Sequence, residues 1–162
     1  SFLGDSILGA GKLILIIIAN VVAFVALAAL IDKVLALFWK PLSLESILGV
    51  IMFPFSWLLG LPVHQAWQLA QDMGMNLLTN EFVVMGKVTA DIAHYSEHLK
   101  AVLTVFVTSF ANFGTLGMII GAFKGLANKE DNDYIASNIG YLLLSGILVS
   151  LLSAAFVGLF VW

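Results

Sequence analysis

The side chain best placed for chemistry in this sequence is the carboxylate of Glu81, which lies in the tripeptide Asn-Glu-Phe at 80–82. The residues on either side of it, 73–80 and 82–86, carry no charge. If this stretch lies in a membrane, a carboxylate there is costly unless it is paired or hydrated, so Glu81 is a candidate functional group. The alternative is that Glu81 lies at the membrane interface and only solvates the end of a hairpin.

A second candidate is Asn112, which interrupts an uncharged stretch at 101–123 together with Gly114 and Gly117. Asn and Gly are poor helix formers, so this pattern predicts a helix broken near its centre. A broken transmembrane helix frees backbone groups at mid-depth, which is how transporters form polar sites. The alternative is close helix packing, because glycines also follow Gly117 at four-residue intervals.

Two histidines form the pattern His-x-x-Glu-His at His94 and His98, which occurs in some zinc proteases. On a helix these two rings would share one face, but a zinc site needs a further ligand, and no acidic residue follows Asp133. We therefore interpret 91–100 as a solvated loop with a helix start and expect both histidines to be dispensable. A membrane metalloenzyme that uses His94 and His98 stays open as an alternative.

Composition decides the environment in which these residues must work. Of the 162 residues, 61% are hydrophobic and 10% are charged, and the mean hydropathy is +1.05. A soluble domain has about 25% charged residues. With a net charge of −3 and no Arg, the chain also lacks the basic face that binds nucleic acid. These values indicate an integral membrane protein and exclude a cytosolic enzyme.

The hydrophobic pattern predicts an all-α membrane protein. The start of the sequence suggests that this chain is part of a longer protein. The region 64–88 is only moderately apolar, and two short helices, 64–73 and 77–88, separated at Gly74 would form a re-entrant hairpin. The predicted order is a pre-membrane segment at 1–12, a transmembrane helix at 13–39, an interfacial helix at 43–62, the hairpin at 64–88, a broken transmembrane helix at 101–127 and a final transmembrane helix at 134–162.

Several motifs resemble the C-terminal half of the concentrative nucleoside transporter family. They occur in the order of that family and extend over essentially the whole chain. They are Gly-Ala-Gly-Lys-Leu at 9–13, the stretch 20–32, Leu-Ser-Leu-Glu-Ser-Ile-Leu-Gly at 42–49, Pro-Phe-Ser-Trp-Leu-Leu-Gly-Leu-Pro at 54–62, Asn-Glu-Phe-Val at 80–83, Phe-Ala-Asn-Phe-Gly-Thr-Leu-Gly at 110–117 and Leu-Leu-Ser-Ala-Ala at 151–155.

The resemblance implies roles for four residues at a nucleoside site. Glu81 and Asn112 would bind the ribose hydroxyls, Thr115 would also contact the ligand, and Phe110 would line the pocket. One departure is Asn76, where the family often has Lys.

The resemblance also implies a homotrimeric secondary transporter in the inner membrane of a bacterium, with an inverted-repeat core. The first transmembrane helix would be a scaffold helix that contacts neighbouring subunits. The coupling ion, sodium or a proton, would be bound mostly by an N-terminal half that precedes this chain. We expect no covalent cofactor and no enzymatic activity. The other open interpretation is a structural subunit whose glycines only pack helices.

Overall fold

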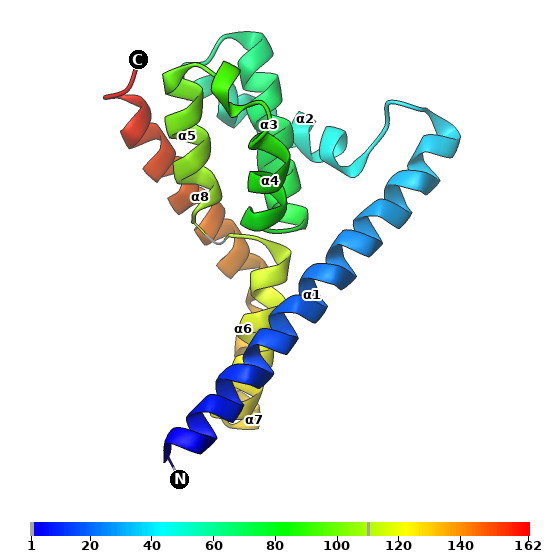
Figure 1. Cartoon of the computed structure of the whole chain (residues 1–162), viewed down its shortest axis with the longest axis vertical. Coiled ribbons are helices and arrows are strands. Elements are labelled where there is room, and N and C mark those ends of the chain that lie inside the picture. Colours follow the sequence, from blue (N-terminus) through cyan, green and yellow to red (C-terminus); the bar gives the residue numbers. More distant parts are fainter. Residues whose placement is uncertain (1, 110) are drawn as a thin grey trace.

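The computed structural model describes residues 2–109 and 111–162, and over these ranges it contains helices and connecting turns without a strand (Figure 1). The described helices are α1 (Phe2–Phe38), α2 (Leu44–Leu58), α3 (Val63–Leu78), α4 (Glu81–Val88), the 3-10 helix η1 (Ile92–His94), α5 (Glu97–Val107), α6 (Phe113–Leu126), α7 (Lys129–Ser137) and α8 (Ile139–Gly158).

Two helices in the described part of the chain, α1 and α8, are long and apolar enough to cross a membrane. At a rise of 1.5 Å per residue, the 37 residues of α1 extend for about 55 Å, which exceeds the apolar core of a bilayer. The separate segment predicted at 1–12 is therefore not observed. Glycines at 9 and 11 weaken a helix by only about 1 kcal/mol each, and no proline stops it.

Helix α1 stands beside the other helices and contacts α6 and α2 (Figure 1). Its end is joined to α2 by Asp32, whose Oδ1 accepts a hydrogen bond of 2.7 Å from the Leu44 backbone N–H. Ser43 and Ser46 then form a capping box that satisfies the first turn of α2. Short polar side chains thus cap the start of α2 and tie it to the last part of α1.

Helices α2 and α3 form a tightly packed antiparallel pair. Ser56 Oγ donates a 2.7 Å hydrogen bond to Ala66 O across this interface. A Cβ placed on Gly74 would lie 2.9 Å from Leu48 Cβ and 3.3 Å from Glu45 O. The predicted break at Gly74 is therefore wrong: Gly74 lies within α3 and allows α2 to approach, and the chain breaks only at 79–80.

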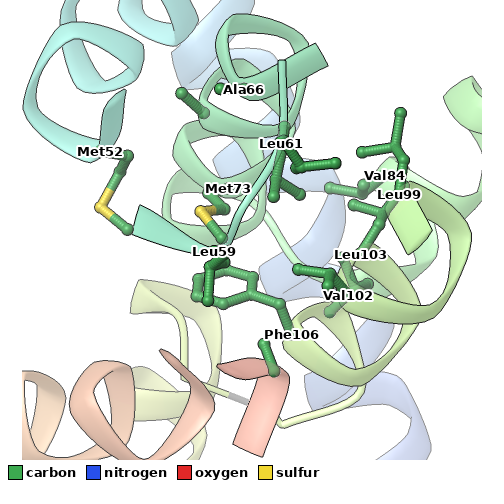
Figure 2. Close-up of a cluster of buried hydrophobic side chains, with 14 of the residues drawn as sticks. Met52, Leu59, Leu61, Ala66, Met73, Val84, Leu99, Val102, Leu103 and Phe106 are labelled. Carbon is green, nitrogen blue, oxygen red and sulfur yellow. The ribbon is translucent and has the colours of Figure 1, made fainter. Parts of the chain in front are cut away.

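Buried apolar side chains from α2, α3, α4 and α5 form the core (Figure 2). Phe106, Leu103 and Met73 are among its largest fully buried members, and Leu59 and Leu61 extend it into the turn between α2 and α3. The tight turn at Gly60 has a φ of 88°, a left-handed conformation that favours glycine. The core thus holds the two arms of the α3–α4 hairpin against α5.

The C-terminal region is divided into α7 and α8 rather than forming one uninterrupted helix across 134–162. Asn138 lies between them, and its Nδ2 donates a 2.9 Å hydrogen bond to Tyr134 O. Such local bonds from Asn side chains compete with helix propagation, which explains the break. Helix α8 then packs along α5.

Candidate functional site

Glu81 begins the second arm of the hairpin. Asn80, just before it, has an extended backbone, and its Oδ1 accepts a 3.1 Å hydrogen bond from the Val83 N–H. This is the geometry of a helix N-cap. The tip of the hairpin therefore presents the N-terminus of α4 together with the carboxylate of Glu81, and the partial positive charge of that helix end favours the carboxylate.

Asn112 caps a second helix in the same way. Helix α5 ends at Val107, and α6 starts after Asn112, whose Oδ1 accepts a 2.7 Å hydrogen bond from the Thr115 N–H. Asn112 is buried, with 1% of its surface exposed. Its amide oxygen is thus used by the backbone of α6, while its NH₂ group is available to donate in two directions.

The two caps meet. Asn112 Nδ2 donates a hydrogen bond of 3.3 Å to Glu81 Oε2, although 31 residues separate them in the sequence. Gly114 makes this approach possible, because a Cβ there would lie 3.1 Å from Thr79 O at the hairpin tip. The structure therefore brings the N-termini of α4 and α6 together around a carboxylate and an amide.

Thr115 is a further polar group on the first turn of α6. Its backbone N–H is used by the Asn112 cap, while its Oγ1 is buried and has no hydrogen-bond partner among the described residues. A buried hydroxyl without a partner is costly unless a ligand or water completes it. Phe110, also predicted to be a site residue, lies outside the described residues.

The hydrogen-bonding capacity left at this site suits a pair of neighbouring hydroxyl groups. Glu81 accepts at two oxygens, and Asn112 Nδ2 has a second N–H beyond the one directed at Glu81. Two hydroxyl groups could therefore donate to the carboxylate while one of them accepts from the amide. Bonds to an ionised carboxylate are shorter and stronger than neutral ones.

The histidine pair is not brought together in this way. His94 is exposed at the end of η1, whereas His98 is 6% exposed on α5, so the prediction of a solvated loop is wrong for His98. Its Nδ1 lies 2.5 Å from Val161 O and its Nε2 lies 2.7 Å from Leu59 O, so both nitrogens face backbone carbonyls. The described residues contain no group of three or more His, Cys, Asp or Glu placed to hold a metal ion.

Comparison with known proteins decides the family. Residues 1–158 match the sequence profile of the family described as Na+ dependent nucleoside transporter C-terminus. The chain belongs to this family. The resemblance noted in the sequence is thereby confirmed, and neither a structural subunit nor a metalloenzyme is favoured, because the relatives are transporters rather than enzymes.

Two named relatives match most or all of the length of this chain. It is 44% identical over 162 residues to the purine nucleoside transport protein NupG of Bacillus subtilis, a match that covers 100% of the chain and 41% of NupG. It is 32% identical over 153 residues to the nucleoside permease NupC of Helicobacter pylori, covering 88% of the chain and 36% of NupC. The chain therefore spans about two-fifths of the length of these relatives.

Solved structures share the fold. An Asn-to-Leu variant of CNTnw in its intermediate 3 state superimposes with a TM-score of 0.87 at 25% identity, over 97% of this chain and 41% of that one. CNTnw in an inward-facing substrate-bound state gives 0.78 at 28% identity, over 88% of this chain and 35% of that one. The all-helical architecture of a membrane transporter is thus supported at the level of the whole chain.

Within the site, sequence reasoning did not single out Asn80. The signal was present, because Asn followed by Glu at the start of an apolar helical stretch is typical of an N-cap with an acidic first turn. Asn112 was interpreted as a helix breaker. Its function as the N-cap of α6 was missed, although Asn before an apolar helical stretch is again typical of an N-cap.

Proposed function

We propose that this chain forms the ribose-binding side of the nucleoside site in a sodium-coupled secondary transporter. The contact between Asn112 and Glu81 at two facing helix N-termini carries the proposal. Both residues belong to motifs of the family, and the free acceptors and donors around them match the two vicinal hydroxyls of ribose. In this proposal Thr115 Oγ1 contacts the sugar, and Phe110 lines the pocket.

The remaining parts of the site lie outside this chain in the proposal. The family description names sodium as the coupling ion, and we propose that the other part of the transporter holds most of its ligands. Among nucleosides we favour purine nucleosides, because the relative with 44% identity is named a purine nucleoside transport protein. We further propose a homotrimer in a bacterial inner membrane, with α1 as the scaffold helix.

Uptake by the intact transporter tests this function. We expect inosine to accumulate in proteoliposomes when an inward sodium gradient is imposed, and to accumulate little when choline replaces sodium. Hypoxanthine, the matching free base, should not accumulate. Sodium-independent accumulation, or equal uptake of inosine and hypoxanthine, would contradict the proposal. Proton coupling would appear as inosine uptake driven by an inward proton gradient without sodium.

The proposed topology makes 63–88 a hairpin that enters the membrane and returns to the same side, with α2 lying at the interface. Neither arm is long: α3 has 16 residues and α4 has 8, whereas a spanning helix needs about 20. This chain contains no cysteine, so in an intact transporter whose remaining part has been made cysteine-free, single cysteines introduced here report on one position each.

We expect His64→Cys, at an exposed position in the first turn of the hairpin, and Ala90→Cys, at an exposed position just after it, to react with a membrane-impermeant maleimide from the same side of the membrane. Labelling in right-side-out and inside-out vesicles measures this. A spanning element between the two positions would instead place them on opposite sides, and labelling from opposite sides would refute the hairpin.

A further inference from the structure

A charged cluster connects the two arms of the hairpin to α2. Lys87 on α4 lies 3.0 Å from Glu45 Oε2 on α2 and 3.6 Å from Asp72 Oδ1 on α3. The three side chains differ in exposure: 45% for Lys87, 28% for Glu45 and 3% for Asp72. One ammonium group therefore faces two carboxyl groups, and the deeper carboxyl group has the longer contact.

Next to this cluster lies a buried polar group without a partner. Asn76 is fully buried, and neither its Oδ1 nor its Nδ2 has a hydrogen-bond partner among the described residues. Asp72 Oδ2 is in the same situation. Four residues separate Asp72 from Asn76 on α3, so the two side chains share one face of the helix. Buried polar atoms without a hydrogen-bond partner are rare in folded proteins, so these atoms need an explanation.

Another part of the transporter does not readily supply the missing partners. The helices of this chain already bury Asp72 to 2% exposure and Asn76 to 0%. A group from outside would reach them only if these helices separated. The partner must therefore be small, or the two orphaned side chains must satisfy each other.

The charge balance of the cluster indicates whether the missing partner is a small ligand or whether Asp72 and Asn76 bond to each other. With all three groups ionised the cluster has a net charge of −1, which is costly in a buried site. One added proton makes the cluster neutral, and desolvation directs that proton to the more buried carboxyl group. Protonated Asp72 gains an O–H donor, and Asn76 Oδ1 is an unused acceptor one helical turn away.

We propose that Asp72 is a proton-binding site of the hairpin: when protonated it donates from Oδ2 to Asn76 Oδ1, and when ionised it pairs with Lys87. The proton comes from solvent, and no bond other than O–H forms or breaks. Protonation thus determines whether Asp72 adds to the attachment of α4 through Lys87. The proposal concerns the hairpin itself and does not depend on the nucleoside function.

The electrostatic surroundings agree with this assignment. Burial has the largest effect on the pKa of Asp72 and raises it; Lys87 on α4 lowers it, Glu45 on α2 raises it, and together these effects place it at about 6. Burial, followed by the charge of Asp72, raises the pKa of Tyr95, which lies just before α5 and whose hydroxyl accepts a 2.6 Å hydrogen bond from Gln68. Because the folded protein binds this proton more tightly than the unfolded chain, Asp72 stabilises the fold most at low pH, and this contribution is lost as pH rises through about 6.

The test is the melting temperature of the intact transporter, followed in detergent from about pH 5 to about pH 8. We expect Asp72→Asn, which mimics the protonated carboxyl group, to remove a fall in melting temperature that the wild type shows across this range. Glu97→Gln is the matched control, because Glu97 is 74% exposed and pairs with Lys100 within its own helix. It should keep the wild-type profile.

Two further variants should move the midpoint of this transition in opposite directions. Lys87→Met removes the group that favours ionised Asp72, so the midpoint should rise by about one pH unit or more. Asn76→Leu removes the acceptor for the protonated form, so the midpoint should fall. Midpoints that move together, or a profile that Asp72→Asn leaves unchanged, would overturn the proposal.

Infrared difference spectra provide a direct readout. The C=O band of a protonated carboxyl group should appear on lowering the pH, be absent in Asp72→Asn and persist in Glu97→Gln. Sodium is the competing occupant. If adding sodium at high pH stabilises the wild type but not Asp72→Asn, and the carboxyl band is missing, the site binds sodium and the proton assignment is wrong.

Discussion

Replacing Glu81 with Gln should weaken nucleoside binding to the intact transporter by about ten- to a hundredfold. Hydrogen bonds to a charged group contribute roughly 1.5–3 kcal/mol each, and a factor of ten corresponds to about 1.4 kcal/mol. Glutamine keeps the size of the side chain but loses the charge and replaces one acceptor oxygen with an NH₂ donor, so the ribose hydroxyls lose their charged acceptor. Isothermal titration calorimetry with inosine measures the change.

Asn112→Ala should also weaken inosine binding, and the double variant should lose less than the sum of the two single losses. The residues touch each other, with 3.3 Å between Asn112 Nδ2 and Glu81 Oε2, and both serve the same sugar. The free-energy effects of substituting two residues that contact each other are generally not additive. Asn112→Asp is a useful comparison, because its carboxylate can still cap α6 while placing a second negative charge beside Glu81.

The ligand itself supplies the matched control. Inosine lacking the 2′-hydroxyl should bind more weakly to the wild type, and it should lose less than inosine when Glu81 is replaced. Hypoxanthine, without a sugar, should be almost unaffected by either substitution. If Glu81→Gln binds inosine as tightly as the wild type, Glu81 is only an interfacial charge and the proposed ribose site is wrong.

Much of the proposed site was predictable because membrane segments make polar residues conspicuous. Glu81 and Asn112 stand out against long uncharged stretches, and a polar side chain in such a position needs a partner. Sequence periodicity cannot show that the partners are each other, because they are 31 positions apart in the sequence and a helix break lies between them. The motif resemblance implied only that both side chains bind the same ribose, and the structure places the two side chains in contact.

Glycine was the least informative signal in the sequence. Gly74 was predicted to break the first arm of the hairpin, yet it lies inside α3 against Leu48 and Glu45. Gly114 was interpreted as loosening a helix, and it instead lets α6 approach Thr79. The same residue type serves as a breaker or as a contact surface, and only the neighbouring helix decides between these functions.

Long-range polar pairs were the other feature beyond sequence reasoning. Lys87 joins α4 to α2 and α3 through Glu45 and Asp72, and no local pattern in the sequence indicates these contacts. The burial of His98 could not be foreseen either, because its neighbours in the sequence, Glu97 and Lys100, are polar. Its partners, Leu59 and Val161, lie 39 and 63 residues away.

His98 is therefore expected to be a structural residue, unlike His94. His98→Ala should lower the free energy of unfolding by about 2–4 kcal/mol, since it removes the imidazole N–H donor that faces the Leu59 and Val161 carbonyls and opens a cavity beside Trp162. The lost ring stacks on that indole, with ring centroids 4.5 Å apart. The space around it is closely filled: a Cβ on Gly158 would lie 3.2 Å from the imidazole Cε1.

His94→Ala is the matched control for this experiment. It is the same substitution, four residues earlier in the same motif, at an exposed position, so it should change the melting temperature of the intact transporter little. His98→Gln should fall between the two alanine variants, because its amide still donates to one carbonyl. Measured together by thermal denaturation in detergent, the three variants should rank His98→Ala lowest and His94→Ala close to wild type. Equal melting temperatures for the two alanine variants would show that the ring of His98 does not hold the turn after α2, α5 and the end of α8 together.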